Sequence, residues 1–456
     1  MRFFWNGLSN HKFVKTNMGL DQLLIKLSAQ DAEDYIGEPV SQLQHALQAA
    51  ALAEAAQADE PQILSALLHD VGHWCEPGAE RMKHLGAMHH ERLGQKFLDQ
   101  LGLHPDVGAL VGLHVDAKRY LAGSQSEYIA KLSAASAETL RLQGGPMNTD
   151  EQRAFESHVL HQKALQLRAW DEAAKDPDRE VRPLGRYSAM LQRNRAEPLS
   201  KDQLKRWQNS GFLHIPGWFS PDEMSDVMQA TASMQLWPES AGKWMKYFEL
   251  EGSERQLCRI ENFLQYQPLF HRISRGASTL HLLSQLMGEK AVLFKEKINF
   301  KLPGGQGFLA HQDAPAFTTF DQRFHITMML SVDPTTVENG CLEIAETQRL
   351  TEFLSMKDDL TLSDDVISSL SWRPVETASG DLVLFDSYLP HRSAPNTSSA
   401  SRRALYATYN LAADGDYRDA YFEKKRKSFP PDVERKAGVK YDEGVFNVGN
   451  PVSIDT

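Results

Sequence analysis

The apolar pattern of the chain changes near residue 200, and this change requires a fold with two unlike parts. Before that point, stretches rich in alanine and leucine have the length of helices and begin or end near prolines. These stretches are residues 43–58, 61–70, 89–101 and 127–141. They show no strand-like alternation. We therefore expect an all-α part over residues 19–195, which ends in a charged linker that contains prolines.

The sequence after residue 200 has a different apolar pattern. A helical stretch at residues 200–210 is followed by runs that alternate apolar and polar residues, with glycine-containing turns between them. The strand-like runs are residues 291–300, 324–332, 341–344, 380–385 and 403–411. Mostly antiparallel strands after a helical lead-in predict a double-stranded β-helix, or jelly roll, with flanking helices over residues 196–456.

Composition excludes several classes of protein. The 456 residues are enough for two domains, and the net charge of −11 disfavours a nucleic-acid partner. The sequence has no apolar run long enough to span a membrane, and its three separated cysteines are typical of free thiols in the cytoplasm. Residues 1–18 are expected to be an N-terminal extension, with Met18 as an alternative start of translation. The oligomeric state is not indicated.

Histidines and aspartates gather in the helical part. The candidate metal ligands are His45, His69, Asp70, His90, His114 and Asp171. Four imidazoles and two carboxylates suit a transition metal and exceed the needs of one ion. A carboxylate such as Asp70 can bridge two ions, and burial of the His69-Asp70 pair is costly unless something pairs with it. For any single histidine, an ordinary core or surface position is the alternative.

A second set of candidate ligands lies among the predicted strands. His311 and Asp313 follow a glycine-rich segment, and His391 follows a strand-like run. Two histidines and one carboxylate leave three positions of an Fe(II) ion open, enough for a bidentate cosubstrate and dioxygen. Arg402 comes shortly after His391, and its planar guanidinium can bind a carboxylate of that cosubstrate. Arg403 is the rival for this role, and the spacing favours Arg402.

The order of the first set resembles the HD-domain superfamily. Over residues 30–190 it is similar to the phosphonate-cleaving mixed-valent diiron oxygenases related to myo-inositol oxygenase, chiefly through Tyr35-Ile36-Gly37-Glu38. This resemblance implies an Fe(II)/Fe(III) pair held by the six candidate ligands. It also implies that Tyr35 is a displaceable ligand and that Glu38 closes over the substrate. The implied phosphonate-binding residues are His73, Lys118, Ser136 and Thr139, and His90 fits the pattern better than His89.

The second set resembles the phytanoyl-CoA dioxygenase family of Fe(II)/2-oxoglutarate oxygenases, over residues 203–415. The residues that carry it are His311, Asp313, the segments 338–342 and 380–381, His391, Ser393 and Arg402. It implies one Fe(II) on the two histidines and Asp313, and 2-oxoglutarate on Ser393 and Arg402. Where the family often has Gly-Ser-His, this chain has Ala345-Glu346-Thr347-Gln348, so phytanoyl-CoA is not implied as the substrate.

Together, the two resemblances imply a bifunctional dioxygenase for a small-molecule phosphonate. The β part would hydroxylate C1 of 2-aminoethylphosphonate with 2-oxoglutarate and O2, and the diiron part would cleave the product to glycine and phosphate. Lys295, Lys297 and Lys301 are candidates for holding the phosphonate, and on a strand all three would share one face. Lys297 is the expected phosphonate ligand, with a solvated strand face as the alternative.

Other interpretations stay open. The substrate could instead be 2-(trimethylammonio)ethylphosphonate or methylphosphonate. The helical part could be an HD phosphohydrolase fused to an unrelated 2-oxoglutarate oxygenase, or a degenerate scaffold, although its complete ligand set disfavours decay.

Overall fold

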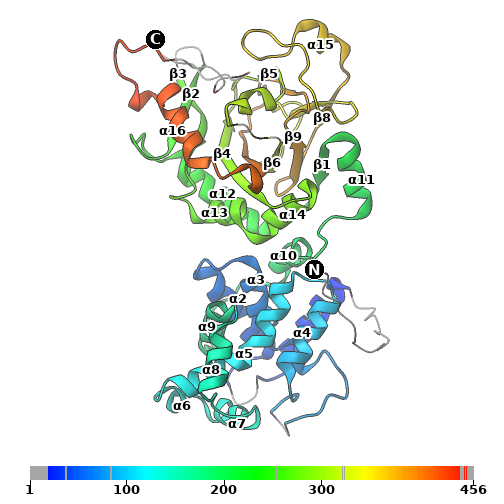
Figure 1. The fold of residues 1–456 in the computed structure, drawn as a ribbon, viewed down its shortest axis with the longest axis vertical. Helices are drawn as coiled ribbons and strands as arrows, with labels where there is room; N and C mark the ends of the chain where they lie inside the picture. The colour runs from blue at the N-terminus through cyan, green and yellow to red at the C-terminus, as the bar shows by residue number, and fades with distance from the viewer. Residues whose placement is uncertain are drawn as a thin grey trace, which may run out of the picture. The chain divides into compact units, whose positions relative to one another are not determined.

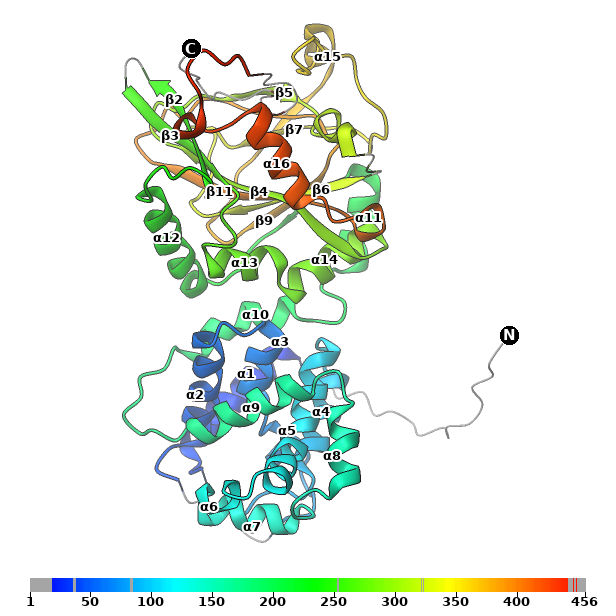
Figure 2. The same cartoon turned by 60° about the vertical axis from the view of Figure 1, so that its left-hand side comes forward.

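The computed structural model describes residues 19–35, 38–82, 85–251, 254–320, 322, 324–441, 446 and 448. The expected N-terminal extension lies outside them. The chain forms two compact units, Met1–Leu184 with Asn194–Ala196, and Gly185–Arg193 with Glu197–Thr456. Helices build the first unit, and strands with covering helices build the second (Figures 1 and 2). The two textures expected from the sequence are therefore confirmed.

Several helices of the first unit begin at a residue whose side chain caps them. The α-helices are α1 (Leu20–Ala29), α2 (Gln42–Ala55), α3 (Glu60–Leu68), α4 (His90–Gln100), α5 (Pro105–Ser124), α6 (Tyr128–Lys131), α7 (Ala134–Leu142), α8 (Thr149–Glu156) and α9 (His161–Ala173). The side chains of Ser41 and Asp59 accept hydrogen bonds from backbone N–H groups in the first turns of α2 and α3. Helix α5 contacts α3, α4, α8 and α9, so it forms the centre of the unit (Figure 2).

The helix expected over residues 127–141 is interrupted. The structure has α6 and α7 there, separated by Leu132 in an extended conformation with ψ 144°. The Ser133 hydroxyl then caps α7 by accepting a hydrogen bond from the backbone N–H of Ser136. A serine cap competes with helix continuation, because its side chain satisfies a backbone donor that a continuous helix would have bonded.

The second unit contains two antiparallel sheets. The strands are β1 (Phe212–Ile215), β2 (Met245–Glu251), β3 (Glu254–Glu261), β4 (Ala291–Lys301), β5 (Phe308–His311), β6 (His325–Ser331), β7 (Leu342–Ala345), β8 (Trp372–Val375), β9 (Leu382–Asp386), β10 (His391–Ser393) and β11 (Arg402–Leu411). The sheet orders are β1-β9-β6-β11-β4-β3-β2 and β5-β10-β7-β8. All these neighbouring strands pair antiparallel, as expected for a jelly roll.

Alternation along the strands divides the core of this unit into layers. On β11, Leu405, Ala407 and Tyr409 pack with residues of the covering helices, whereas Ala404 and Tyr406 pack toward the smaller sheet. The helices of this unit are α10 (Tyr187–Arg193), α11 (Lys201–Ser210), α12 (Pro221–Gln235), α13 (Pro268–Arg275), α14 (Ala277–Met287), α15 (Asp364–Ser369) and α16 (Arg418–Ser428). Among the described residues, no helix has the length and apolar character needed to cross a bilayer.

Candidate metal centres

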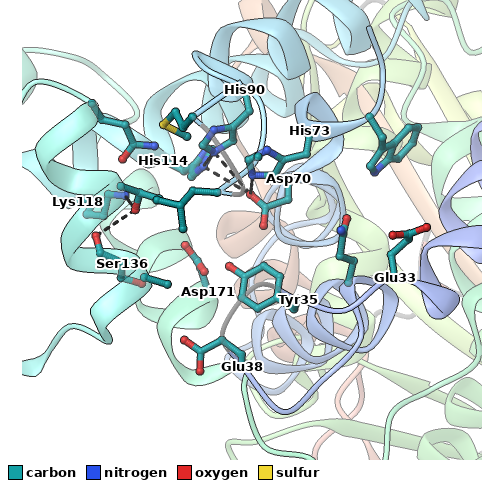
Figure 3. Close-up of a pocket in the computed structure, with 18 of the residues that line it drawn as sticks. Glu33, Tyr35, Glu38, Asp70, His73, His90, His114, Lys118, Ser136 and Asp171 are labelled. Carbon is teal, nitrogen blue, oxygen red and sulfur yellow. Dashed lines mark hydrogen bonds and ion pairs between the residues drawn. The ribbon is translucent and has the colours of Figure 1, made fainter. Parts of the chain in front are cut away.

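Six predicted ligands converge in the first unit. They are His45 on α2, His69 and Asp70 after α3, His90 at the start of α4, His114 on α5 and Asp171 on α9. All except Asp70 are almost completely buried. Figure 3 shows the Asp70 carboxylate in contact with the imidazoles of His73, His90 and His114 at one end of a cavity. Burial of so many polar groups is costly unless they share a ligand.

The two carboxylate oxygens of Asp70 face two different groups of imidazoles. Oδ2 lies 3.4 Å from Nε2 of His69 and 3.8 Å from Nε2 of His45. Oδ1 lies 3.7 Å from Nε2 of His90 and 3.9 Å from Nε2 of His114. One carboxylate therefore stands between two ligand clusters, an arrangement in which it can bridge two ions.

Hydrogen bonds define the protonation of the first cluster. The Nδ1 atoms of His45 and His69 both lie 2.8 Å from carbonyl oxygens, those of Ala174 and Ala66. A carbonyl only accepts, so both Nδ1 atoms carry a proton, and in the neutral rings the Nε2 atoms hold lone pairs. The two Nε2 atoms are 3.0 Å apart, and Asp171 Oδ1 lies 3.4 Å from that of His45. Two ring nitrogens this close to each other and to a carboxylate need a cation between them, either a proton or a metal ion, and the donor set fits a transition-metal ion.

The electrostatics of the first cluster lead to the same conclusion. Burial alone would lower the pKa of His69, but the carboxylates of Asp70 and Asp171 outweigh it and raise the pKa to about 9. The two carboxylates therefore favour a positive charge at His69 Nε2, which a proton supplies in the absence of metal and which a bound metal ion would supply in its place.

The second cluster consists of neutral imidazoles. The Nε2 atoms of His90 and His114 lie 3.0 Å apart, and His114 Nδ1 donates to the carbonyl of Val111 at 2.6 Å. Burial, together with the nearby His69, lowers the pKa of His114 to about 4, and burial also lowers the pKa of His90. Neutral imidazole is the form that binds metals. His73 lies beside this cluster, with its Nε2 3.7 Å from Asp70 Oδ1, but its Nδ1 accepts a hydrogen bond of 3.1 Å from the Ala87 backbone N–H, so in the neutral ring Nε2 carries the proton and can donate to a ligand.

Backbone geometry separates His90 from its neighbour His89. His89 precedes α4 with a left-handed φ of 56°, and its side chain is 64% exposed, whereas His90 is buried. Gly72 permits this packing, since a Cβ at that position would lie 1.8 Å from the carbonyl oxygen of His90. The structure therefore places His90 in the cluster and His89 outside it.

A cavity of about 340 Å³ adjoins the two clusters. On one wall, Lys118 Nζ donates to Thr139 Oγ1 at 3.1 Å, and Ser136 lies beside them (Figure 3). Burial, then repulsion from Arg168, lowers the pKa of Lys118 to about 7. An amine and two hydroxyls give this wall the donors that an anionic group needs.

Tyr35 and Glu38 line the other side of the cavity, while Ile36 and Gly37 between them lie outside the described residues. The Tyr35 ring stacks on His45, with centroids 3.9 Å apart. Burial, then the Asp70 carboxylate, raises the pKa of Tyr35 well above its ordinary value, so its hydroxyl is protonated. Glu38 accepts a hydrogen bond of 2.6 Å from Lys175 Nζ.

Two further residues of this site were not predicted from the sequence. Arg168 donates to Asp171 Oδ2 at 2.5 Å and thereby holds that carboxylate in place. Its position three residues before Asp171 on a helix was a signal that could have been used. Lys175 follows α9 in an irregular segment, so nothing in the local pattern indicated its contact with Glu38.

Strand pairing assembles the candidate centre of the second unit. His311 ends β5 and His391 begins β10, and the two are cross-strand partners with ring centroids 4.3 Å apart. Asp313 Oδ1 lies 3.8 Å from His311 Nε2. Both histidines donate from Nδ1 to a carbonyl two residues earlier, at 2.7 Å for Leu309 and 3.0 Å for Leu389. Their Nε2 lone pairs are thus free to bind a metal with Asp313.

Alternation on β11 distinguishes the two candidate arginines. Arg402 is buried and donates to the Tyr406 hydroxyl at 3.1 Å, whereas Arg403 forms an ion pair with Asp333 at 2.7 Å. Lys301, opposite Arg402 on β4, donates to Ser393 Oγ at 2.8 Å. Arg402, Ser393 and Lys301 therefore form one polar group, and Arg403 lies apart from it.

Two small cavities, each of about 40 Å³, flank the histidines and Asp313. Lys295 and Lys297 line both of them. The first also includes Arg259, and the second also includes Ser393. Burial lowers the pKa of both lysines, and repulsion from Arg259 and Lys295 lowers that of Lys297 further.

Comparisons with known proteins identify the family of the second unit. Residues 207–404 match the family described as Phytanoyl-CoA dioxygenase. The chain is 47% identical over 257 residues to 2-aminoethylphosphonate dioxygenase of uncultured bacterium HF130_AEPn_1, covering 56% of this chain and 98% of the relative. It is 37% identical over 231 residues to methylphosphonate hydroxylase of Gimesia maris, covering 51% and 88%.

A further relative is named for a 1-hydroxyphosphonate substrate. The chain is 40% identical over 163 residues to [1-hydroxy-2-(trimethylamino)ethyl]phosphonate dioxygenase (glycine-betaine-forming) of Leisingera caerulea. The match covers 35% of this chain and 82% of the relative.

Proposed function

The chain belongs to the phytanoyl-CoA dioxygenase family, and on that premise we propose that it degrades a phosphonate in two oxidative steps. In the first, the β unit hydroxylates C1 of 2-aminoethylphosphonate while 2-oxoglutarate and O2 become succinate and CO2. In the second, the helical unit uses another O2 to convert the hydroxyphosphonate to glycine and phosphate. The observation that carries this proposal is the position of Asp70 between two imidazole clusters, in a chain that also brings His311, Asp313 and His391 together.

The chemistry explains why two steps are needed. Direct hydrolysis of a carbon–phosphorus bond would release a carbanion, whereas prior oxidation of the carbon avoids this. A mononuclear Fe(II) would supply dioxygen activation in the first step, and a mixed-valent iron pair would supply it in the second. Names of the relatives support the same order, since one describes oxidation of an aminophosphonate and another describes oxidation of a 1-hydroxyphosphonate.

For the first step, we assign His311, Asp313 and His391 as the Fe(II) ligands. Arg402 and Ser393 would bind the distal carboxylate of 2-oxoglutarate, in the polar group that also contains Lys301. Lys297 would bind the substrate from the wall between the two cavities. The alternation of β11 supports Arg402 over Arg403, because Arg403 is already paired with Asp333.

For the second step, Asp70 would bridge two irons, with the remaining ligands on either side. Those ligands are His45, His69 and Asp171 for one ion, and His90 and His114 for the other. Lys118, Ser136, Thr139 and His73 would hold the phosphonate. Tyr35, which stacks on His45, would be displaced when the substrate binds, and Glu38 would bind the ammonium group of the substrate.

Phosphorus NMR tests the proposal directly. Iron-loaded protein with 2-aminoethylphosphonate, 2-oxoglutarate, ascorbate and air should release inorganic phosphate, and omission of 2-oxoglutarate should prevent it. Accumulation of a hydroxyphosphonate without phosphate would reject the second step. If 2-aminoethylphosphonate is unchanged, the methyl and trimethylammonio analogues are the next substrates, because relatives are named for both groups. Release of phosphate from phosphomonoesters without O2 would favour a phosphohydrolase instead.

A further inference from the structure

Four cationic side chains line the first cavity beside His311 and Asp313; one of them, Lys425 on α16, is held by Glu261, and the other three lie on two adjacent strands. Arg259 lies on β3, and Lys295 and Lys297 lie on the adjacent strand β4. Strand pairing aligns them, since Arg259 pairs with Asn299, two residues from Lys297 on the same side of β4. Positive charge is thus concentrated on one face of this part of the sheet.

These cations have unused hydrogen-bond donors. Arg259 is 4% exposed, and its buried Nε has no partner, although Nη1 contacts Glu261 at 3.1 Å. For Lys295 and Lys297, no hydrogen bond or ion pair to another described residue is found. Their ammonium groups instead lie near aromatic rings, 4.4 Å from the centroid of Phe317 and 5.4 Å from that of Tyr406. Buried donors without partners indicate a ligand that supplies acceptors.

The acidic residues of the cavity neutralise these cations only in part, because Glu261, which pairs with Arg259 at 3.1 Å, is shared with Lys425. Both carboxylate oxygens of Glu261 accept hydrogen bonds of 2.7 Å from Lys425. Both oxygens of Glu296 accept from Arg418, at 2.8 and 2.6 Å. Asp313 is the proposed iron ligand. Because buried like charges repel strongly, the cluster needs a multiply charged anion for balance.

We propose that Arg259, Lys295 and Lys297 form the binding site for the phosphonate dianion in the first oxidative step. This inference rests on the proposed function and adds the residues that would select the charged group. The two lysines also line the second cavity, next to Ser393. They therefore separate the phosphonate from 2-oxoglutarate and attract both anions, whereas Arg259 lines the cavity assigned to the phosphonate.

The division of roles can be measured by initial rates of succinate formation in the full-length, iron-loaded protein. Arg259→Gln should raise KM for 2-aminoethylphosphonate about 10- to 100-fold, the range expected for loss of a charged hydrogen bond, and leave KM for 2-oxoglutarate within about twofold. Lys297→Gln should raise both KM values, and Lys297→Arg should restore most of the affinity. Lys290→Gln, at an exposed lysine just before β4, is the matched control and should change neither.

A second measurement uses the wild-type protein and does not depend on folding of a variant. Inorganic phosphate should inhibit competitively against 2-aminoethylphosphonate. The sulfonate 2-aminoethanesulfonate has a similar shape but only one negative charge, so it should inhibit at least about tenfold more weakly than phosphate. Arg259→Gln should reduce this preference for the dianion. A substitution that only disturbs the fold would weaken inhibition by both compounds equally.

The possible outcomes distinguish failure of the proposed function from failure of the proposed phosphonate site. Wild-type protein that oxidises no phosphonate would reject the proposed function. Wild-type protein that oxidises it, with an Arg259→Gln variant of unchanged phosphonate KM, would reject this site alone. An Arg259→Gln variant that raises only KM for 2-oxoglutarate would show that the two cavities hold the opposite ligands.

Discussion

His69 and His114 in the helical unit donate from Nδ1 to carbonyls three residues earlier, whereas His311 and His391 in the β unit donate to carbonyls two residues earlier. Both devices orient a ring through its own local backbone. The units differ in how the ligands meet. In the helical unit the ligands come from separate helices, and in the β unit two adjacent strands supply both histidines.

This difference determines which structural feature each centre depends on. The β centre depends on one strand register, because His311 and His391 are direct cross-strand partners. The helical centre depends on the packing of several helices around one shared carboxylate, Asp70. Loss of Asp70 should therefore remove both proposed irons of the helical unit, whereas loss of His391 should remove the one proposed iron of the β unit.

Asp70→Ala should produce the largest effect. Both proposed irons of the helical unit lose their common ligand, so phosphate release should fall by at least about a thousandfold while the 2-oxoglutarate-dependent step continues. Metal analysis should show about one iron per chain, and phosphorus NMR should show the hydroxyphosphonate accumulating. Retention of three irons would contradict the bridging role of Asp70.

His391→Ala is the corresponding variant in the β unit. It should abolish succinate formation, since the proposed mononuclear site loses one of its three protein ligands. The same variant, supplied with the 1-hydroxyphosphonate, should still release phosphate at close to the wild-type rate. If that second activity also disappears while the protein stays folded by circular dichroism, the two centres are not independent.

Arg402→Gln and Arg403→Gln compare two neighbouring residues on opposite faces of β11. The first should raise KM for 2-oxoglutarate about a hundredfold, because Arg402 is buried beside Ser393's partner Lys301. The second should leave that KM within about threefold and lower only the thermal midpoint, since Arg403 pairs with Asp333. Equal effects on KM would reject the assignment of Arg402.

Glu38→Gln should have the smallest effect, and it tests the helical cavity alone. Lys175 already neutralises this carboxylate, so the substrate's ammonium must compete for it. We expect KM for the amino-hydroxyphosphonate to rise about tenfold and KM for hydroxymethylphosphonate, which has no amine, to stay unchanged. Lys175→Met should lower the first KM. Parallel changes for both substrates would exclude ammonium recognition by Glu38.

Local patterns were enough to predict the two textures of the chain and many of its elements. The alternation at residues 403–411 corresponds to β11, and the alanine-rich stretch at 43–58 corresponds to α2. The same patterns failed where a local bond competed with propensity, as at Ser133, which divides one expected helix in two. They also missed the hairpin of β2 and β3, whose polar residues weaken the apolar signal.

Residue chemistry and spacing indicated candidate metal ligands, because a histidine beside an aspartate is costly to bury without a partner, and the family resemblance selected His90 over His89. Only the tertiary structure decided which oxygen of Asp70 faces which imidazoles, and that Arg259 and Lys175 join the sites. The physical reason is that backbone hydrogen bonds and apolar periodicity act over a few residues. Charge pairing acts between groups that are adjacent in space and distant in the sequence, such as Glu38 and Lys175.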